Sequence, residues 1–148
     1  MQYQLWQSLD RAAERDSDHP AFRCAGVDLS YGGLIERADR LAGLLRERGV
    51  RRHDRVGLFM PKSLETAVSI YGILRAGAAY VPIDPAAPPE RIAFLLRDCG
   101  IRHLLTRPEM KRSLLRLSAL EPTLDTVIGF DKPDVLPWTT LSWTDAAA

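Results

Sequence analysis

The chain offers few residues whose types and spacing could do chemistry. The run Pro61-Lys62-Ser63 holds the Lys-Ser pair of a phosphate-binding loop, but no glycine precedes it to let backbone N–H groups wrap a phosphate. This run therefore predicts the start of a helix. The histidines His19, His53 and His103 lie far apart, and none has a second ligand at a metal-site spacing. We expect no catalytic, cofactor-binding or metal-ligating residue in this sequence.

The composition is that of an ordinary globular domain. With 20 basic and 19 acidic residues in 148, the net charge of +1 gives no reason to expect a nucleic-acid or membrane partner. Cys24 and Cys99 are far apart in the sequence, which favours reduced, packed thiols over a disulfide. The N-terminus lacks the basic and apolar regions of a secretory signal. We therefore expect a cytoplasmic protein.

The first third of the sequence predicts two helices around a short β-hairpin. Residues 3–15 carry apolar residues at helical spacing, and residues 21–24 and 28–30 indicate two short strands around a turn at Gly26. A long helix is predicted at residues 31–48, and Gly49 marks its end. Its apolar positions form one continuous stripe, made of Leu34, Ala38, Leu41, Ala42 and Leu45.

The remainder alternates strand and helix patterns. Short apolar runs predict four strands, at residues 55–60, 79–81, 102–106 and 126–130, of which the first two are expected to be buried. Helices are predicted between them, the first capped by Ser63 and ended by Gly77. Parallel strands need long, right-handed connections. The alternation therefore predicts an α/β fold with a parallel, helix-flanked sheet, preceded by the N-terminal helix and short β-hairpin.

Two further features predict that the chain is an incomplete unit. Residues 131–148 contain prolines and show no period, so an irregular tail is expected there. The helix pattern at residues 67–74 is apolar almost all round, and the chain's own sheet is expected to cover only one side of it. Apolar surface left exposed in this way favours association, so we expect the isolated chain to self-associate or to need a partner segment.

Two motifs resemble those of a known family. Residues 74–85 (Leu-Arg-Ala-Gly-Ala-Ala-Tyr-Val-Pro-Ile-Asp-Pro) resemble the second core motif of the adenylate-forming ligases, and residues 29–34 with 38–42 resemble the first. This superfamily includes amino-acid adenylation domains, acyl-CoA synthetases and luciferases. The resemblance covers residues 5–130, nearly the whole chain. It implies that residues 1–148 are the N-terminal segment of an adenylate-forming, AMP-binding domain, with residues 131–148 leading to a missing downstream part.

The resemblance also implies an activity for the complete enzyme. Such ligases use ATP and Mg2+ to activate a carboxylic or amino acid as an acyl-adenylate, which then passes to the thiol of carrier-protein phosphopantetheine or of CoA. The family's phosphate loop, ribose-binding aspartate and assisting lysine lie downstream of residues 1–148. We therefore expect this segment alone to be inactive and to bind no cofactor tightly. The pair Asp84-Pro85 favours the amino-acid branch and nonribosomal peptide synthesis, and the start at Met1 favours a stand-alone ligase or a first domain.

The residues that match the family pattern have structural roles. Tyr31 resembles the tyrosine that opens the first long helix, and Gly77 the glycine of a tight helix-to-strand turn. Pro82 and Asp84 match the end of the buried strand, and residues 90–92 match the start of the next helix.

Three positions depart from the family pattern. Gly33 replaces a usual glutamate at the helix start, and Ala87 replaces a common aromatic residue. Ala86 stands near the place where some acyl-CoA ligases have a CoA-binding arginine, so one pointer toward CoA is missing.

An alternative of another class is a catalytically inactive α/β interaction or ligand-binding module. A receiver-like domain would need acidic residues after its first strand, but the run after Phe59 here is Met60-Pro61-Lys62. Ligands of such modules bind at the carboxyl ends of the strands.

Overall fold

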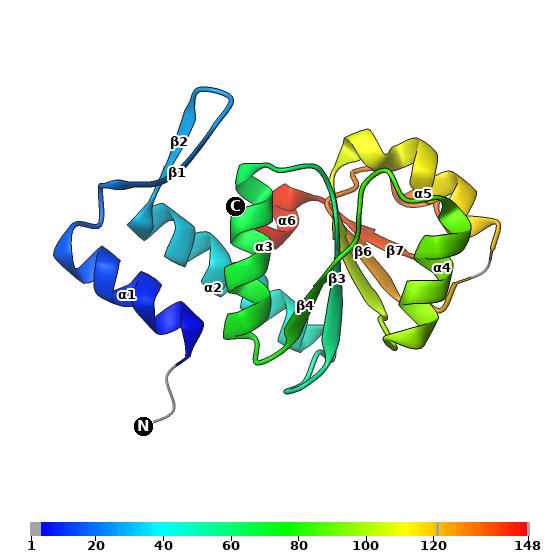
Figure 1. Ribbon diagram of the computed structural model, residues 1–148, viewed down its shortest axis with the longest axis horizontal. Helices are drawn as coiled ribbons and strands as arrows, with labels where there is room; N and C mark the ends of the chain where they lie inside the picture. Colours follow the sequence, from blue (N-terminus) through cyan, green and yellow to red (C-terminus); the bar gives the residue numbers. More distant parts are fainter. Residues whose placement is uncertain (1–3, 121, 148) are drawn as a thin grey trace.

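A computed structural model of the chain describes residues 4–120 and 122–147. Its centre is a parallel sheet of five strands in the order β4-β3-β5-β6-β7 (Figure 1). The strands are β3 (Arg55–Phe59), β4 (Ala79–Pro82), β5 (His103–Thr106), β6 (Thr126–Ile128) and β7 (Thr139–Leu141). The predicted α/β class with a parallel, helix-flanked sheet is confirmed.

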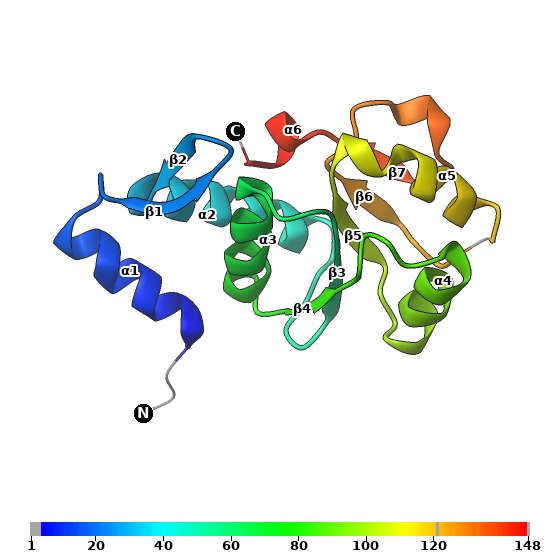
Figure 2. The same cartoon turned by 45° about the horizontal axis from the view of Figure 1, so that its top comes forward.

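Helices cover both faces of this sheet. One face packs against α2 (Tyr31–Glu47), α3 (Leu64–Arg75) and the short α6 (Trp143–Ala147), and the other packs against α4 (Pro89–Asp98) and α5 (Lys111–Ser118) (Figure 2). Successive side chains of a strand point to opposite faces. Accordingly, Leu105 and Ile128 belong to the core under α2 and α3, whereas their neighbours Leu104 and Val127 belong to the core under α4 and α5.

The N-terminal elements lie beside the first helical layer rather than on the sheet (Figure 1). They are α1 (Leu5–Arg15) and the antiparallel hairpin of β1 (Pro20–Cys24) and β2 (Val27–Ser30). Ala25 and Gly26 connect the two strands with φ angles of 50° and 79°, the positive values that a two-residue hairpin turn needs. The predicted hairpin and its turn at Gly26 are confirmed; the predicted helix start at Tyr3 lies outside the described residues.

The helix α3 is covered more completely than the sequence suggests. Every residue of α3 is buried or half-buried, because α2 packs along it as well as the sheet. Gly72 permits this approach, since a Cβ atom there would lie 2.7 Å from Cδ2 of Leu41. The sheet covers one side of this helix, as expected, but the inference that its other side would be exposed is wrong, because the apolar stripe of α2 packs against it.

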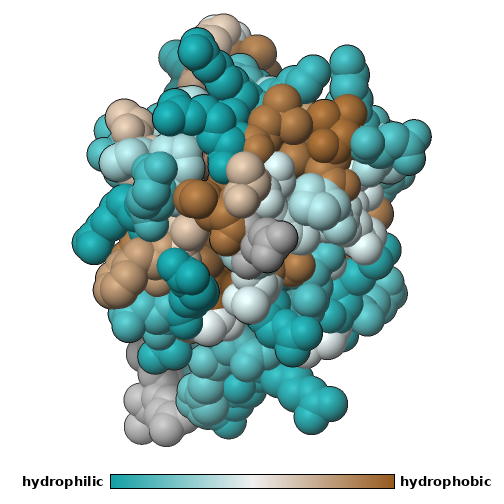
Figure 3. Space-filling view, turned by 90° about the vertical axis from the view of Figure 1, so that its right-hand side faces the viewer, coloured by the Kyte–Doolittle hydropathy of each residue, from teal (hydrophilic) through white to brown (hydrophobic). Residues whose placement is uncertain are grey.

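Exposed apolar side chains occur instead in the N-terminal elements, at Leu5, Phe22 and Val27, and on the opposite layer. Phe94 of α4 is 51% exposed, and Leu115 and Leu120 at α5 and its end are each 38% exposed. Figure 3 shows hydrophobic side chains among polar ones on this side of the molecule. Self-association of the isolated chain stays a prediction, with this face as its expected contact.

Two other expectations are corrected. Residues 131–147 are not irregular, because a 3-10 turn at Pro133–Val135, the strand β7 and the helix α6 form there. β7 has only three residues, too few for a recognisable alternation, and it is defined by its parallel pairing with β6.

The strand β4, expected to be buried, is an edge strand whose Tyr80 and Val81 are only half-buried.

No helix in the described part of the chain is long and apolar enough to cross a membrane. Cys24 and Cys99 are both free and partly buried, as expected for reduced thiols.

Gly77 supplies the turn between α3 and β4. Its φ of +86° lies in the left-handed region, and its carbonyl accepts a 3.0 Å hydrogen bond from the His53 N–H. Only ordinary contacts with Arg52, at 3.7 Å or more, would meet a Cβ here, so backbone strain is the main penalty for a side chain. We expect Gly77→Val to lower the free energy of unfolding by about 1–3 kcal/mol, measured by urea denaturation. An unchanged midpoint would contradict a strained turn at this position.

Candidate functional site

The carboxyl edge of the sheet contains a switch point between β3 and β5. From β3 the chain crosses to β4 on one side and later to β5 on the other, so the loops that follow β3 and β5 diverge. Parallel α/β folds bind ligands outside the carboxyl ends of the strands at such a point. This edge is therefore the candidate site of the described chain.

Hydrogen bonds tie the two strand ends together at this point. The Thr106 hydroxyl donates to the carbonyl oxygen of Phe59 at 2.7 Å, which joins β5 to β3. The indole Nε1 of Trp143 donates to the carbonyl oxygen of Thr106 at 2.8 Å. Gly129, at the end of β6, leaves room for this indole, because a Cβ atom there would lie 2.5 Å from Nε1. The side chain of Trp143 therefore packs directly over the switch point.

The local sequence fixes α6 and with it Trp143. The hydroxyl and backbone N–H of Ser142 donate to the Asp145 carboxylate at 2.8 and 3.2 Å, and the Asp145 N–H donates back to the Ser142 hydroxyl at 3.0 Å. These bonds satisfy backbone groups at the start of the helix. The hydrogen bond from the Ser142 hydroxyl holds the pKa of Asp145 below its ordinary value.

The start of α3 is neutralised by the chain's own side chains. Ser63 caps the helix by accepting the Thr66 N–H, which confirms that Pro61-Lys62-Ser63 is a helix start. Glu65 lies in the first turn, where a negative charge suits the helix dipole. Its carboxylate pairs with Arg107 at 3.2 Å, and Arg107 also pairs with Glu109 at 3.0 Å. The helix end that could attract a phosphate therefore already faces a carboxylate.

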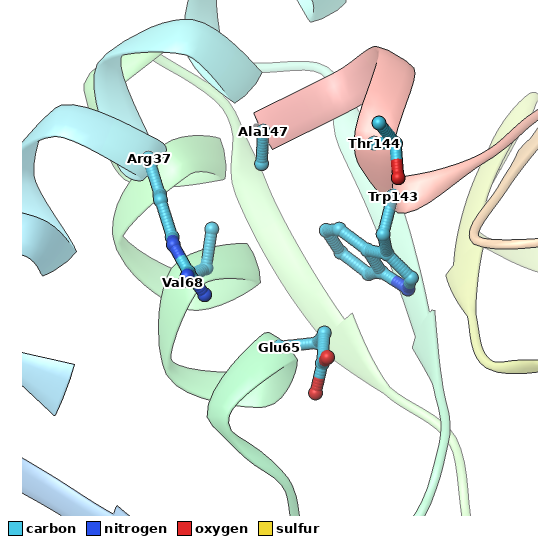
Figure 4. Close-up of a pocket in the computed structure, with 6 residues that line it drawn as sticks. All are labelled: Arg37, Glu65, Val68, Trp143, Thr144 and Ala147. Atoms are coloured by element: carbon cyan, nitrogen blue, oxygen red, sulfur yellow. The ribbon is translucent and has the colours of Figure 1, made fainter. Parts of the chain in front are cut away.

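A small pocket lies beside these groups (Figure 4). It has a volume of about 180 Å3 and is lined by Arg37, Glu65, Val68, Trp143, Thr144 and Ala147. In Figure 4 the Arg37 side chain extends from α2 past Val68, and the indole of Trp143 faces the pocket from the other side. Sites for cofactor-sized ligands usually enclose about 300–1,000 Å3. With Glu65 at its wall and this small volume, the pocket does not fit ATP.

The sequence-predicted positions serve structure at other places. Tyr31 begins α2 and stacks on His19, with ring centroids 6.3 Å apart. Asp84 accepts the Ala86 N–H at 2.9 Å in the turn after β4, and Pro89 begins α4. Within the described residues, no group of three or more His, Cys, Asp or Glu side chains could hold a metal ion.

Sequence reasoning missed the groups that do meet at the switch point. Thr106 and Trp143 are joined through a backbone carbonyl, and Arg107 joins Glu65 from a position 42 residues away. Nothing in their spacing signals these contacts, because the parallel register of β3 and β5 creates them. The tryptophan also lies in the segment for which no regular structure was expected.

The chain has a parallel α/β fold in which the Trp143 side chain covers the switch point. Comparison with known proteins shows the family to which this fold belongs. The sequence profile of the family described as AMP-binding enzyme matches residues 9–148. The chain belongs to this family. The predicted resemblance to adenylate-forming ligases, as an N-terminal portion, is confirmed.

Similar proteins include synthases of tyrocidine and surfactin. Tyrocidine synthase 3 of Brevibacillus parabrevis is 45% identical over 106 residues, which is 72% of this chain and 2% of that protein. Surfactin synthase subunit 3 of Bacillus subtilis (strain 168) is 37% identical over 138 residues, which is 92% of this chain and 11% of that protein. The chain therefore spans only a small part of the length of these relatives.

Solved structures of the same fold include enzymes with adenylates bound. The nonribosomal peptide synthetase FmoA3, in its α-methyl-L-serine-AMP bound form, superposes with a TM-score of 0.75 and 33% identity. That match covers 99% of this chain and 15% of the FmoA3 chain. The anthranilate CoA ligase AuaEII, in complex with anthranoyl-AMP, superposes with a TM-score of 0.85 and 26% identity, covering 97% of this chain and 27% of the ligase.

Proposed function

We propose that the chain is the N-terminal part of an ATP-dependent ligase that activates an amino acid as an aminoacyl-adenylate and transfers it to a thiol. The observation that carries this proposal is the family match over residues 9–148, joined to identities of 45% and 37% with two peptide synthetases. These relatives favour carrier-protein phosphopantetheine as the acceptor. AuaEII is named as a CoA ligase, which would favour CoA, but its sequence identity to this chain is lower, at 26%.

In this reaction the carboxylate of the substrate attacks the α-phosphate of ATP and pyrophosphate leaves. The thiol then attacks the carbonyl carbon of the adenylate and AMP leaves. Opposed negative charges must be neutralised for the first step, which is the usual task of Mg2+ and a lysine. The pocket beside Trp143 does not fit ATP, so we assign the ATP, Mg2+ and amino-acid sites to the rest of the enzyme. We place the complete enzyme in the cytoplasm.

The role that we assign to the described residues is to support that downstream site. The carboxyl edge is held rigid by the bonds of Thr106 and Trp143 and by the ion pairs of Arg107. Catalytic groups work best when rigid elements hold them in place. We propose that the segment following α6 builds the phosphate-binding part of the enzyme against this edge.

A chimera tests the proposal. Residues 9–148 would replace the matching segment of surfactin synthase subunit 3, and amino-acid-dependent exchange of pyrophosphate into ATP would be measured. We expect exchange within about tenfold of the parent, which corresponds to about 1.4 kcal/mol, and the amino-acid preference of the parent.

The control rebuilds the relative's own segment between the same junctions. A chimera that is folded and soluble but inactive, beside an active control, would overturn the proposal.

A further inference from the structure

A second pocket lies at the opposite, amino edge of the sheet. It has a volume of about 320 Å3 and is formed where β3 and β5 begin and where α2 and α4 end. Its charged and polar lining consists of Arg48, Arg55, Arg102, Asp54, Asp125 and His103. The carboxyl-edge site lies at the opposite ends of the same strands, so this pocket is separate from the switch point.

His103 is the anomalous group in this pocket. It is only 9% exposed, and its Nδ1 is buried without a hydrogen-bond partner among the described residues. A buried polar atom left unpaired costs free energy, and most such atoms in folded proteins have a partner. Burial lowers the pKa of His103 below its ordinary value, so the ring is neutral near pH 7.

The charges around His103 do not cancel. Arg102 pairs with Asp125 at 2.7 Å, and the Asp54 carboxylate accepts the Arg51 N–H at 2.7 Å. In residues 4–120 and 122–147, no carboxylate pairs with Arg48 or Arg55, and Arg55 makes one long hydrogen bond, 3.5 Å, to the carbonyl of Cys99. A backbone N–H does not neutralise the Asp54 carboxylate, so the lining of three arginines and two aspartates holds an excess of one positive charge.

These arginines are not needed to cap the adjacent helices. At the end of α2 the N–H groups of Gly49 and Val50 donate to carbonyls of the last turn, at 3.0 and 2.9 Å. At the end of α4 the N–H groups of Gly100 and Ile101 do the same, at 3.2 and 2.8 Å. The chain's own backbone thus satisfies carbonyl groups that cationic side chains often serve.

We propose that the amino-edge pocket binds a phosphate group, held by the guanidinium groups of Arg48 and Arg55 beside the ring of His103. Guanidinium groups make strong, charge-assisted hydrogen bonds to phosphate oxygens. The volume of about 320 Å3 accepts inorganic phosphate or pyrophosphate. This site goes beyond the proposed ligase function and does not depend on it.

The site should respond to pH through His103. The groups that act on this ring are Asp125 and Asp54, which favour its protonated form, and Arg102 and Arg48, which oppose it; Arg55 also faces the pocket. A bound phosphate dianion adds negative charge and favours the protonated ring. Phosphate itself gains protons over the same range, so the effect of His103 is measured against a His103→Leu variant: relative to that variant, binding to the unsubstituted chain should tighten as the pH falls from about 8 to about 6.

The test is a titration of the 148-residue chain followed by NMR, with separate arms for inorganic phosphate and pyrophosphate at constant ionic strength. We expect saturable shifts of the His103 ring and of the Gly49 and Gly100 amides. Binding in either arm supports the site, and the arm that binds more tightly identifies the ligand. Arg48→Gln and Arg55→Gln should each weaken binding by about fivefold or more.

Arg112→Gln is the matched control, because it removes the same charge from the exposed face of α5. His103→Leu should leave only the pH dependence that the protonation of the phosphate itself causes. Shifts reproduced by sodium chloride, shifts that do not saturate, or equal weakening by Arg48→Gln and Arg112→Gln would overturn the proposal.

Discussion

Gly129→Ala is expected to destabilise the fold by about 4 kcal/mol or more, at the upper end for a single substitution. The φ of Gly129 is +101°, a backbone conformation that strains any residue with a side chain. A Cβ atom there would collide with the carbonyl oxygen of Thr106 and would lie 2.5 Å from Nε1 of Trp143. Neither neighbour can move without breaking the hydrogen bond between Trp143 and the carbonyl oxygen of Thr106. The free-energy costs of backbone strain and of the lost hydrogen bond therefore add.

Gly26→Ala separates these two contributions. Gly26 also has a positive φ, +79°, but nothing lies within 4 Å of the Cβ position. We expect this control to lose only the backbone term, about 1 kcal/mol. Urea denaturation of both variants gives the comparison. Equal midpoints would show that the indole of Trp143 does not pack against Gly129 as described.

Arg75→Ala is expected to cost about 2 kcal/mol, because this side chain joins three helices and is largely buried. Its guanidinium pairs with Asp10 of α1 at 2.7 Å and with Asp39 of α2 at 2.6 Å. It also lies over the Trp6 ring, 5.1 Å from the centroid. Both aspartates keep access to solvent, so the loss is smaller than for a fully buried pair.

The matched control is Arg40→Ala. Arg40 pairs with Glu36 four residues earlier on the exposed side of α2, and such pairs contribute about 0.3–0.5 kcal/mol. Hydrogen exchange gives a second measurement, since Arg75→Ala should release α1 before the rest of the fold. Unchanged protection of α1 in Arg75→Ala would contradict the role given to this arginine.

Elements with a strong local pattern could be predicted from the sequence. The stripe of residues 31–48 has the period of a helix, and α2 begins at Tyr31 and ends at Glu47, within one residue of the prediction. The turn at Gly77 was predictable because only glycine adopts a left-handed conformation at little cost. In both places the local signal agrees with the tertiary structure.

Elements that depend on distant partners could not be predicted. β7 has three residues and exists through its pairing with β6. The switch point depends on Thr106, Trp143 and the register of β3 with β5, none of which has a sequence signature. The same holds for Arg75, whose partner Asp10 lies 65 residues away. Side chains placed by topology can be found only after the topology is known.

We infer that this chain supplies the structural N-terminal part of an adenylating enzyme whose reactive groups lie elsewhere. Reconstitution in trans distinguishes this arrangement from an active chain. Three samples would be assayed for amino-acid-dependent pyrophosphate exchange: this chain, the part of surfactin synthase subunit 3 that follows the matched segment, and both together. We predict exchange only in the mixture. Exchange by this chain alone, or a mixture that forms a stable complex without exchange, would contradict the claim.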